Sequence, residues 1–347
     1  MIKISAISLL LLLTSACQLK YIVKSGYEQA RLLSQSVPNK KALESDSLDE
    51  ESKRKIRLIE EAHEFAKEEL KLASTKNYTQ FVQLDRPYVS YIVSAALQYE
   101  LKPYLWKFPI VGELPYKGFF SVEDVKKEEE DLKRQNLDTY TRGVSAYSTL
   151  GYFKDPILSS MLRYPDHELV NLVIHETIHS TLYIKSSADF NERLAVFLGS
   201  KGAELFYIKK EGSASSTLQL IKNENADDKI FSEFLSAEIK NLEEWYKTLN
   251  TEDSKKSELK KTKLAELQNK FRKEVLPKLK TQSYKRFSDE PINNASLLAL
   301  NTYVGDLTDF EMAYKKNDND FHKALQYFIS LEKTKEPEKA LLDFTHL

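Results

Sequence analysis

The chain has 347 residues, with 51 Lys and Arg against 52 Asp and Glu, and one cysteine. This length is enough for one large domain or two ordinary domains with a buried core. The near-neutral balance excludes a sequence-wide basic surface of the kind that binds nucleic acid, and a single cysteine excludes an intramolecular disulfide.

The N-terminal residues read MIKISAISLLLLLTSAC, an apolar run followed by small residues. The run is too short to span a membrane as a stable helix, and it predicts a signal peptide over residues 1–16. Cys17 follows the small residues directly, as in the signals of bacterial lipoproteins, whose cysteine is lipidated and becomes the mature N-terminus.

We therefore expect a lipid anchor at Cys17, which would hold the protein at a membrane without a spanning helix. The alternative is ordinary cleavage after Ala16, which leaves Cys17 as a free thiol. Gln18 stands where an aspartate would favour retention in the inner membrane. The expected location is therefore the outer membrane of a bacterium, facing the periplasm.

Residues 17–55 are rich in Ser, Lys, Asp and Asn, and this composition predicts a tether or irregular lead-in. From Ile56 the apolar residues recur at spacings of three and four, which predicts a helix. Aromatic and β-branched residues between residues 88 and 120 alternate with turn formers and predict strands with tight turns. A polar helix follows, and residues 139–144 alternate as a strand does.

A strong helical pattern begins at Asp166 and runs to about Tyr183, with an apolar face. The connection IKSSAD leads into a second helix from about Phe190 to Tyr207. Beyond residue 216 the pattern is almost wholly helical.

Two histidines of the first of these helices lie four residues apart, in the order His175-Glu176-x-x-His179. On a helix both imidazoles project from the same face, so both can bind one metal ion about 2 Å away. In the His-Glu-x-x-His arrangement the histidines bind zinc, and the glutamate takes a proton from the activated water. The competing interpretation is a surface helix with two incidental histidines.

A third ligand is expected at Glu192, at the start of the next helix. Three protein ligands leave one position open for water, as in catalytic zinc sites, whereas structural sites use four. Two alternatives stay open for this residue. With Asp189 it forms a helix-capping pattern, and Glu204, further along the same helix, is a second candidate ligand.

Several blocks of the chain share a wider resemblance: WKFPIVGELPYKGFF, GVSAYSTLGYFKDPILSSML, LVNLVIHETIHSTLYI, FNERLAVF and NNASLLALNTY. In this order they resemble a family of zinc aminopeptidases predicted in bacteria, often as lipoproteins, over nearly all of the mature chain. The resemblance implies a gluzincin-like site with His175, His179 and Glu192 as ligands and Glu176 as general base. It also implies that YSTLGYF borders the cleft as an edge strand along which a peptide can be laid.

Together these patterns predict an α+β, zincin-like fold of the gluzincin type. A catalytic domain with a small mixed sheet is expected over residues 56–215, and a helical subdomain that closes the cleft over residues 216–347. The expected function is zinc-dependent hydrolysis of peptide bonds by an aminopeptidase, with one zinc ion per chain. An endopeptidase or a hydrolase of peptidoglycan peptides would use the same residues. A lipid-anchored scaffold or binding protein with a structural zinc is the alternative of another class, although it has no need for Glu176.

Two further roles have less specific candidates. Tyr303 and Tyr147 are candidate donors to the developing oxyanion, a contribution of about 3 kcal/mol. The chain has 19 tyrosines, so packing is the competing interpretation for both. An aminopeptidase also needs an anion for the free amine of its substrate. Glu113, in the turn VGELPYKG, is the candidate, and an exposed turn residue is the plain alternative.

Overall fold

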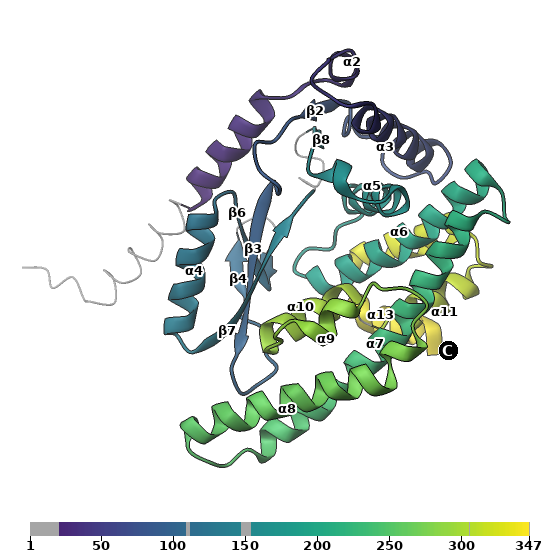
Figure 1. Ribbon diagram of the computed structural model, residues 1–347. Coiled ribbons are helices and arrows are strands. Elements are labelled where there is room, and N and C mark those ends of the chain that lie inside the picture. Colours follow the sequence, from purple (N-terminus) through teal and green to yellow (C-terminus); the bar gives the residue numbers. More distant parts are fainter. Residues whose placement is uncertain (1–20, 109–111, 147–153, 305, 347) are drawn as a thin grey trace, which may run out of the picture.

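The computed structural model describes residues 21–108, 112–146, 154–304 and 306–346. Helices dominate and three small sheets accompany them, so the fold is of the α+β class, as predicted (Figure 1). The strands are β1 (Val37–Pro38), β2 (Gln80–Val82), β3 (Ser90–Leu97), β4 (Trp106–Phe108), β5 (Gly112–Leu114), β6 (Tyr116–Phe119), β7 (Leu137–Val144) and β8 (Ile157–Leu158).

The first helix covers residues 21–34, and the other α-helices follow it along the chain (Figure 1). They are α2 (Asn39–Leu43), α3 (Glu50–Glu68), α4 (Val122–Arg134), α5 (Asp166–Thr181), α6 (Ala188–Glu211), α7 (Ser216–Thr248), α8 (Asp253–Glu274), α9 (Lys285–Asp289), α10 (Asn294–Val304), α11 (Thr308–Lys316), α12 (Phe321–Ser330) and α13 (Pro337–His346). No helix in the described ranges combines the length and the apolar character needed to cross a bilayer.

The strands expected between residues 88 and 120 and at 139–144 are present. β3 is the central strand of an antiparallel sheet, with β6 on one side and β7 on the other. Ile92 of β3 stands opposite Gly118 of β6 and Arg142 of β7. A second sheet, β1-β2-β8, is mixed, because β1 is antiparallel and β8 parallel to β2. The hairpin β4-β5 forms a third sheet.

The two faces of the antiparallel sheet have different surroundings, because successive residues of a strand point to opposite sides. One face packs Val93 and Phe119 against Val125 of α4, which is the polar helix expected from the sequence. The opposite face carries Ile92 and Arg142, which are half-buried. The part of this face around Ile92 and Arg142 is therefore accessible to a ligand.

The main hydrophobic core is built around α5, which lies between α3 and α6 (Figure 1). Leu169, Val173 and Ile174 of α5 are fully buried there. Gly202 of α6 allows the two helices to approach, because a Cβ at this position would lie 2.9 Å from Ile174 Cγ2. The expected pair of helices is thus confirmed, and it forms the centre of the fold.

The helices beyond residue 216 divide between two cores. Those from α7 to α10 form a second core, in which Phe231, Phe271 and Phe287 make edge-to-face contacts. Those from α11 to α13 return to α6 and bury Phe310 and Phe328 in the main core. The predicted helical character of this region is confirmed, but the described helices do not form one separate subdomain.

The tether predicted for residues 17–55 is wrong for the part that the structure describes. Residues 21–34 are helical, and β1 pairs with β2. Asn39 is buried and donates a hydrogen bond to the backbone oxygen of Tyr78. The polar composition suggested a tether because some of these polar residues cap helices. The Asp49 side chain, for example, accepts a hydrogen bond from a backbone N–H at the N-terminal end of α3.

Asn294 connects the antiparallel sheet to the C-terminal helices and is fully buried. Its Nδ2 donates to the backbone oxygens of Leu97 and Gln98 at 2.8 and 3.1 Å. Its Oδ1 accepts from the hydroxyl of Tyr246 in α7 at 2.8 Å, and its backbone N–H donates to Asp138 of β7 at 2.9 Å. One side chain therefore satisfies polar groups of the β3 end and of α7.

We predict that Asn294→Ala lowers the free energy of unfolding by about 2–4 kcal/mol, because it leaves the buried Tyr246 hydroxyl and the part-buried backbone oxygens of Leu97 and Gln98 without this partner. Urea denaturation followed by circular dichroism measures this change. Asn250→Ala, at an exposed position, is the control and should change the free energy by less than about 0.5 kcal/mol. Equal stability of the two variants would contradict the role assigned to Asn294.

Candidate metal and catalytic site

Three side chains from α5 and α6 converge on one point. His175 and His179 of α5 place their Nε2 atoms 3.1 Å apart, with the ring planes at 86°. The carboxylate of Glu192 in α6 faces both, with Oε2 3.6 Å from Nε2 of His175 and Oε1 3.7 Å from Nε2 of His179. The three side chains are 7–16% exposed. The structure thus brings together the three residues expected as ligands.

The separations between these atoms fit a zinc ion. Bonds of about 2.0–2.2 Å in a tetrahedron separate the ligand atoms by about 3.3–3.6 Å, close to the separations of 3.1, 3.6 and 3.7 Å here. Two imidazoles and a carboxylate are also a donor set that zinc prefers. Nδ1 of His179 is buried without a hydrogen-bond partner in the described ranges. Edge contacts with the rings of His175 and Tyr183 hold that imidazole instead.

The charge of Glu192 is matched to this environment. Burial by itself raises the pKa of the carboxyl group, but the adjacent imidazoles of His175 and His179 outweigh burial and hold the pKa well below its ordinary value. The carboxylate is therefore ready to bind a cation as the charged species.

A short connection orients α6 against α5. Asn191, next to Glu192, is buried and forms two hydrogen bonds with Ile184: its Oδ1 accepts from the backbone N–H at 2.9 Å, and its Nδ2 donates to the backbone oxygen at 2.7 Å. Gly199 lies further along α6, where a Cβ would come 2.7 Å from Asn171 Oδ1 and 3.4 Å from His175 Cβ. The amide of Asn191 and the missing side chain at Gly199 together fix the distance between the ligands.

Two alternatives were open for the third ligand: Glu204 in place of Glu192, and a capping role for Glu192. The structure shows neither of them. Glu204 accepts a hydrogen bond from Nδ2 of Asn225 in α7 at 2.8 Å. Helix α6 begins after Ser187 without a side-chain capping bond, and Glu192 faces the histidines. The capping pattern with Asp189 is therefore not formed by Glu192.

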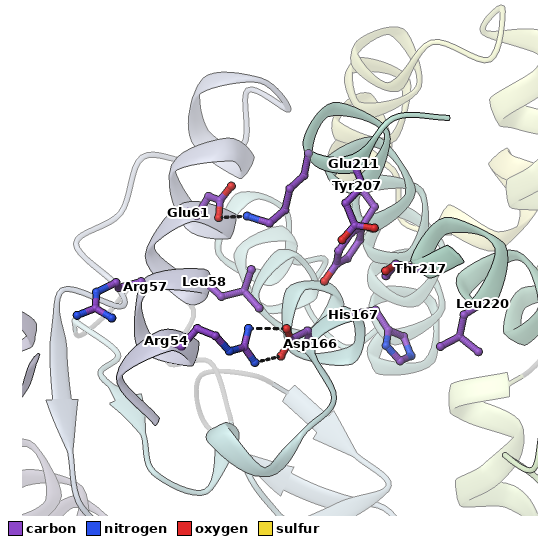
Figure 2. A pocket seen from close by; sticks show the side chains of 11 residues that line it. Arg54, Arg57, Leu58, Glu61, Asp166, His167, Tyr207, Glu211, Thr217 and Leu220 are labelled. Carbon is purple, nitrogen blue, oxygen red and sulfur yellow. Dashed lines mark hydrogen bonds and ion pairs between the residues drawn. The ribbon is translucent and has the colours of Figure 1, made fainter. Parts of the chain in front are cut away.

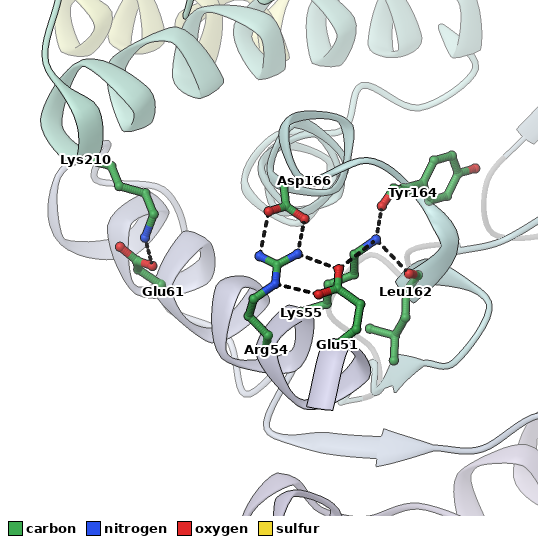
Figure 3. A network of polar contacts seen from close by, with 8 residues as sticks. All are labelled: Glu51, Arg54, Lys55, Glu61, Leu162, Tyr164, Asp166 and Lys210. Carbon is green, nitrogen blue, oxygen red and sulfur yellow. Dashed lines mark hydrogen bonds and ion pairs between the residues drawn. The ribbon is translucent and has the colours of Figure 1, made fainter. Parts of the chain in front are cut away.

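The first turn of α5 is fixed by α3 and by the segment before it. Arg54 donates hydrogen bonds to both carboxylate oxygens of Asp166, at 2.6 and 2.8 Å (Figure 3). Lys55 donates to the backbone oxygens of Leu162 and Tyr164, just before the helix begins. These contacts hold the N-terminal end of the helix that carries both histidines.

A pocket of about 330 Å³ lies beside this end of α5 (Figure 2). The ion pairs Arg54–Asp166 and Lys210–Glu61 lie in its wall, so these four side chains neutralise one another. None of the residues expected for catalysis lines this pocket in the described part of the chain.

A larger cleft, with a volume of about 620 Å³, contains the candidate site. The open face of the β6-β3-β7 sheet forms one wall, with Ile92 and Arg142, and α5 with His175 and His179 forms another. Tyr21, at the start of the helix over residues 21–34, also lines the cleft. The described lining residues all precede residue 197, so the helices beyond residue 216 do not close this cleft in the ranges that the structure covers.

Glu176 also lines the cleft, directly after the first histidine. Its carboxylate has no hydrogen bond or ion pair with the described residues. Burial raises its pKa to about 7; His175 opposes the rise, and the negative charges of Glu192 and Asp155 add to it. Such a shift is typical of carboxyl groups in catalytic clefts.

Some residues singled out from the sequence lie elsewhere. Glu113 belongs to β5 and pairs with Lys107 of β4 at 3.1 Å, and it is not among the described residues of the cleft. Glu113 thus faces its hairpin partner, and its role as an anchor for a substrate amine stays a prediction. Tyr303 is part of α10, but its side chain lies outside the described structure. Tyr147, the segment YSTLGYF and Cys17 also lie outside the described residues.

Other residues line the cleft without having been expected there: Glu168, Asn171 and Tyr183. Oδ1 of Asn171 is buried without a partner among the described residues. Glu168 and Asn171 precede His175 by seven and four residues. This spacing places them on the same side of α5 as the histidine, and it was the signal in the sequence that could have identified them.

Comparison with known proteins gives one family and no individual relative. The search of curated proteins and the search of solved structures returned no match. A family model described as "Putative aminopeptidase" matches residues 20–342. The match spans nearly the whole chain, including α5 and α6, which carry the candidate ligands, and the sheet beside them. The chain therefore belongs to the Putative aminopeptidase family, a family of peptidases that act on peptide substrates.

Proposed function

We propose that this protein is a zinc-dependent aminopeptidase with a zincin-like site of the gluzincin type. The observation that carries the proposal is the meeting of His175, His179 and Glu192 beside the unpaired carboxylate of Glu176 in one cleft. Family membership supports the peptidase activity. A set of three ligands favours a catalytic ion over a structural one, which would use four.

Zinc, when bound, supplies a Lewis-acidic charge that polarises a peptide carbonyl and acidifies water. Nε2 of His175 and of His179 and the carboxylate of Glu192 are the atoms that would hold it. The carboxylate of Glu176 takes a proton from the attacking water and delivers it to the leaving amine nitrogen, a transfer that contributes about 10²–10⁴-fold to the rate. The half-buried face of the β6-β3-β7 sheet forms a wall against which the peptide lies.

A hydrogen-bond donor to the oxygen that gains charge would contribute about 3 kcal/mol. Tyr303, expected from the sequence, stays a prediction for this role. Tyr183 is a second candidate, because it lines the cleft and its ring centre lies 6.3 Å from that of His179.

We further propose that Cys17 carries a lipid anchor in the cell envelope of a bacterium, on the outer membrane facing the periplasm. The apolar run and small residues before Cys17 support this proposal. Mass spectrometry of the mature N-terminus tests it, with an acylated Cys17 expected. An unmodified thiol at Cys17 in protein purified from membranes would contradict the anchor.

For the metal site we predict that the wild-type chain binds one zinc ion, and that His179→Ala and Glu192→Gln each weaken zinc binding by at least about 100-fold, because each removes one of three ligands. Competition with a zinc chelator measures this affinity. Zinc should also raise the melting temperature of the wild type, since it binds the folded state alone.

Glu204→Gln is the matched control for Glu192→Gln, because it changes an acid of the same helix that Asn225 engages instead. Its zinc affinity should stay within about twofold of the wild type. If Glu204→Gln lost zinc and Glu192→Gln kept it, Glu204 and not Glu192 would be the third ligand.

For catalysis we predict that Glu176→Gln keeps its zinc and loses about 10²–10⁴-fold in kcat on peptides with free N-termini, because the amide cannot take the proton. Glu130→Gln changes an exposed acid of α4 outside the described lining of the cleft; it is the control and should keep kcat within about twofold. Cleavage of acetylated peptides by the wild type would identify an endopeptidase. Bound zinc without cleavage of any peptide would favour a scaffold protein.

A further inference from the structure

Glu168 is an acid of the cleft that the proposed reaction does not use. It lies two turns before His175 on α5 and lines the same cleft as Asn171 and Leu172. The first turn of this helix is fixed by the Arg54–Asp166 contact (Figure 3). The position of Glu168 along the cleft is therefore set by a rigid element.

The carboxylate of Glu168 has no hydrogen bond or ion pair within the described ranges. A carboxylate oxygen of Glu224 and a ring nitrogen of His167 lie within 4.8 Å of it, and these two are already paired with each other at 3.1 Å. Burial raises the pKa of Glu168; His167 opposes the rise, and the negative charge of Glu224 adds to it. The side chain is exposed to the cleft and has no ion-pair partner among the described residues, so an ammonium group can reach it and pair with it.

The other charges of the cleft favour a cationic ligand at this place. Glu168, Glu176 and Glu192 are its carboxylates, and Arg142 is the one Lys or Arg side chain among its described lining residues. Glu192 faces the histidines and Glu176 stands beside them, so both act at the reacting bond. Glu168, two turns away, is the acid that can hold a group at the end of the substrate.

We propose that Glu168 binds the protonated N-terminal amine of a peptide substrate, an inference that rests on the proposed function. An ammonium group donates charge-assisted hydrogen bonds to a carboxylate, which are among the stronger polar contacts in proteins. Asn171 lies between Glu168 and the histidines on the same side of α5 and lines the cleft there.

The position of Glu168 also predicts which peptide bond reaches the metal site. Seven residues of helix separate Glu168 from His175, a rise of about 10 Å. An extended peptide covers about 3.3–3.6 Å per residue, so about three residues span this distance. The proposed aminopeptidase should therefore be of the tripeptidyl type, which releases short peptides of about three residues from the N-terminus of its substrate and not single amino acids.

The decisive experiment compares binding and cleavage in the zinc-loaded chain without residues 1–17. Binding of trialanine and of N-acetyl-trialanine to the wild type, Glu168→Gln and Glu168→Asp is measured by calorimetry. We expect the wild type to bind the free amine about 10–100-fold more tightly than the acetylated peptide. Glu168→Gln should lose this preference, and Glu168→Asp, which keeps the charge, should retain part of it.

Glu130→Gln is the matched control, because it removes an exposed acid of α4 that also has no partner among the described residues. It should keep the preference of the wild type. The same preference in Glu168→Gln and the wild type, or no preference in the wild type, would overturn the assignment of Glu168.

Mass spectrometry of the products of longer peptides tests which peptide bond is cleaved. Together with the binding data it distinguishes a failure of the Glu168 assignment from a failure of the proposed function. Tripeptide products from the wild type would support the predicted cleavage position, and release of single amino acids would overturn it. An amine preference that depends on Glu168 in a protein that cleaves nothing would sink the peptidase proposal and leave the amine site standing. Cleavage with an amine preference that does not depend on Glu168 would overturn the amine site and leave the peptidase proposal standing.

Discussion

The close approach of α5 and α6 is the contact on which the site depends. The two imidazoles come from one helix and the carboxylate from the other, so the distance between the helix axes sets the size of the candidate metal site. Gly199 and Gly202 present no side chain toward α5, and a Cβ at either position would collide with it. Metal sites tolerate errors of about 0.2 Å in their bond lengths. Two residues without side chains therefore determine whether three ligands can meet.

The two acids beside the histidines experience opposite environments. The imidazoles hold Glu192 in its charged form, whereas burial and the nearby negative charges favour the neutral form of Glu176. Different environments give two carboxyl groups of one cleft different pKa values, and so allow them different chemical roles. The sheet contributes a half-buried wall with few charges, so the acidic character of the cleft comes from α5 and α6.

The local parts of this site could be predicted from the sequence, and the long-range parts could not. His175 and His179 share a face because helix geometry fixes residues four apart, and Glu192 follows on the next helix. The contact of Glu113 with Lys107 could not be predicted, because Lys107 comes from the opposite strand of a hairpin whose register the sequence does not reveal. Residues 21–55 were taken for a tether because capping and buried polar residues such as Asn39 have the composition of a linker.

The connection between α5 and α6 is held by an amide side chain and not by a covalent cross-link. Asn191 bonds both backbone groups of Ile184, as a neighbouring strand would do. The one cysteine of the chain is at position 17, and the three converging ligand atoms are nitrogen and oxygen. No thiol therefore takes part in the geometry of the site, so oxidants and reductants that exchange disulfides leave its ligand set unchanged.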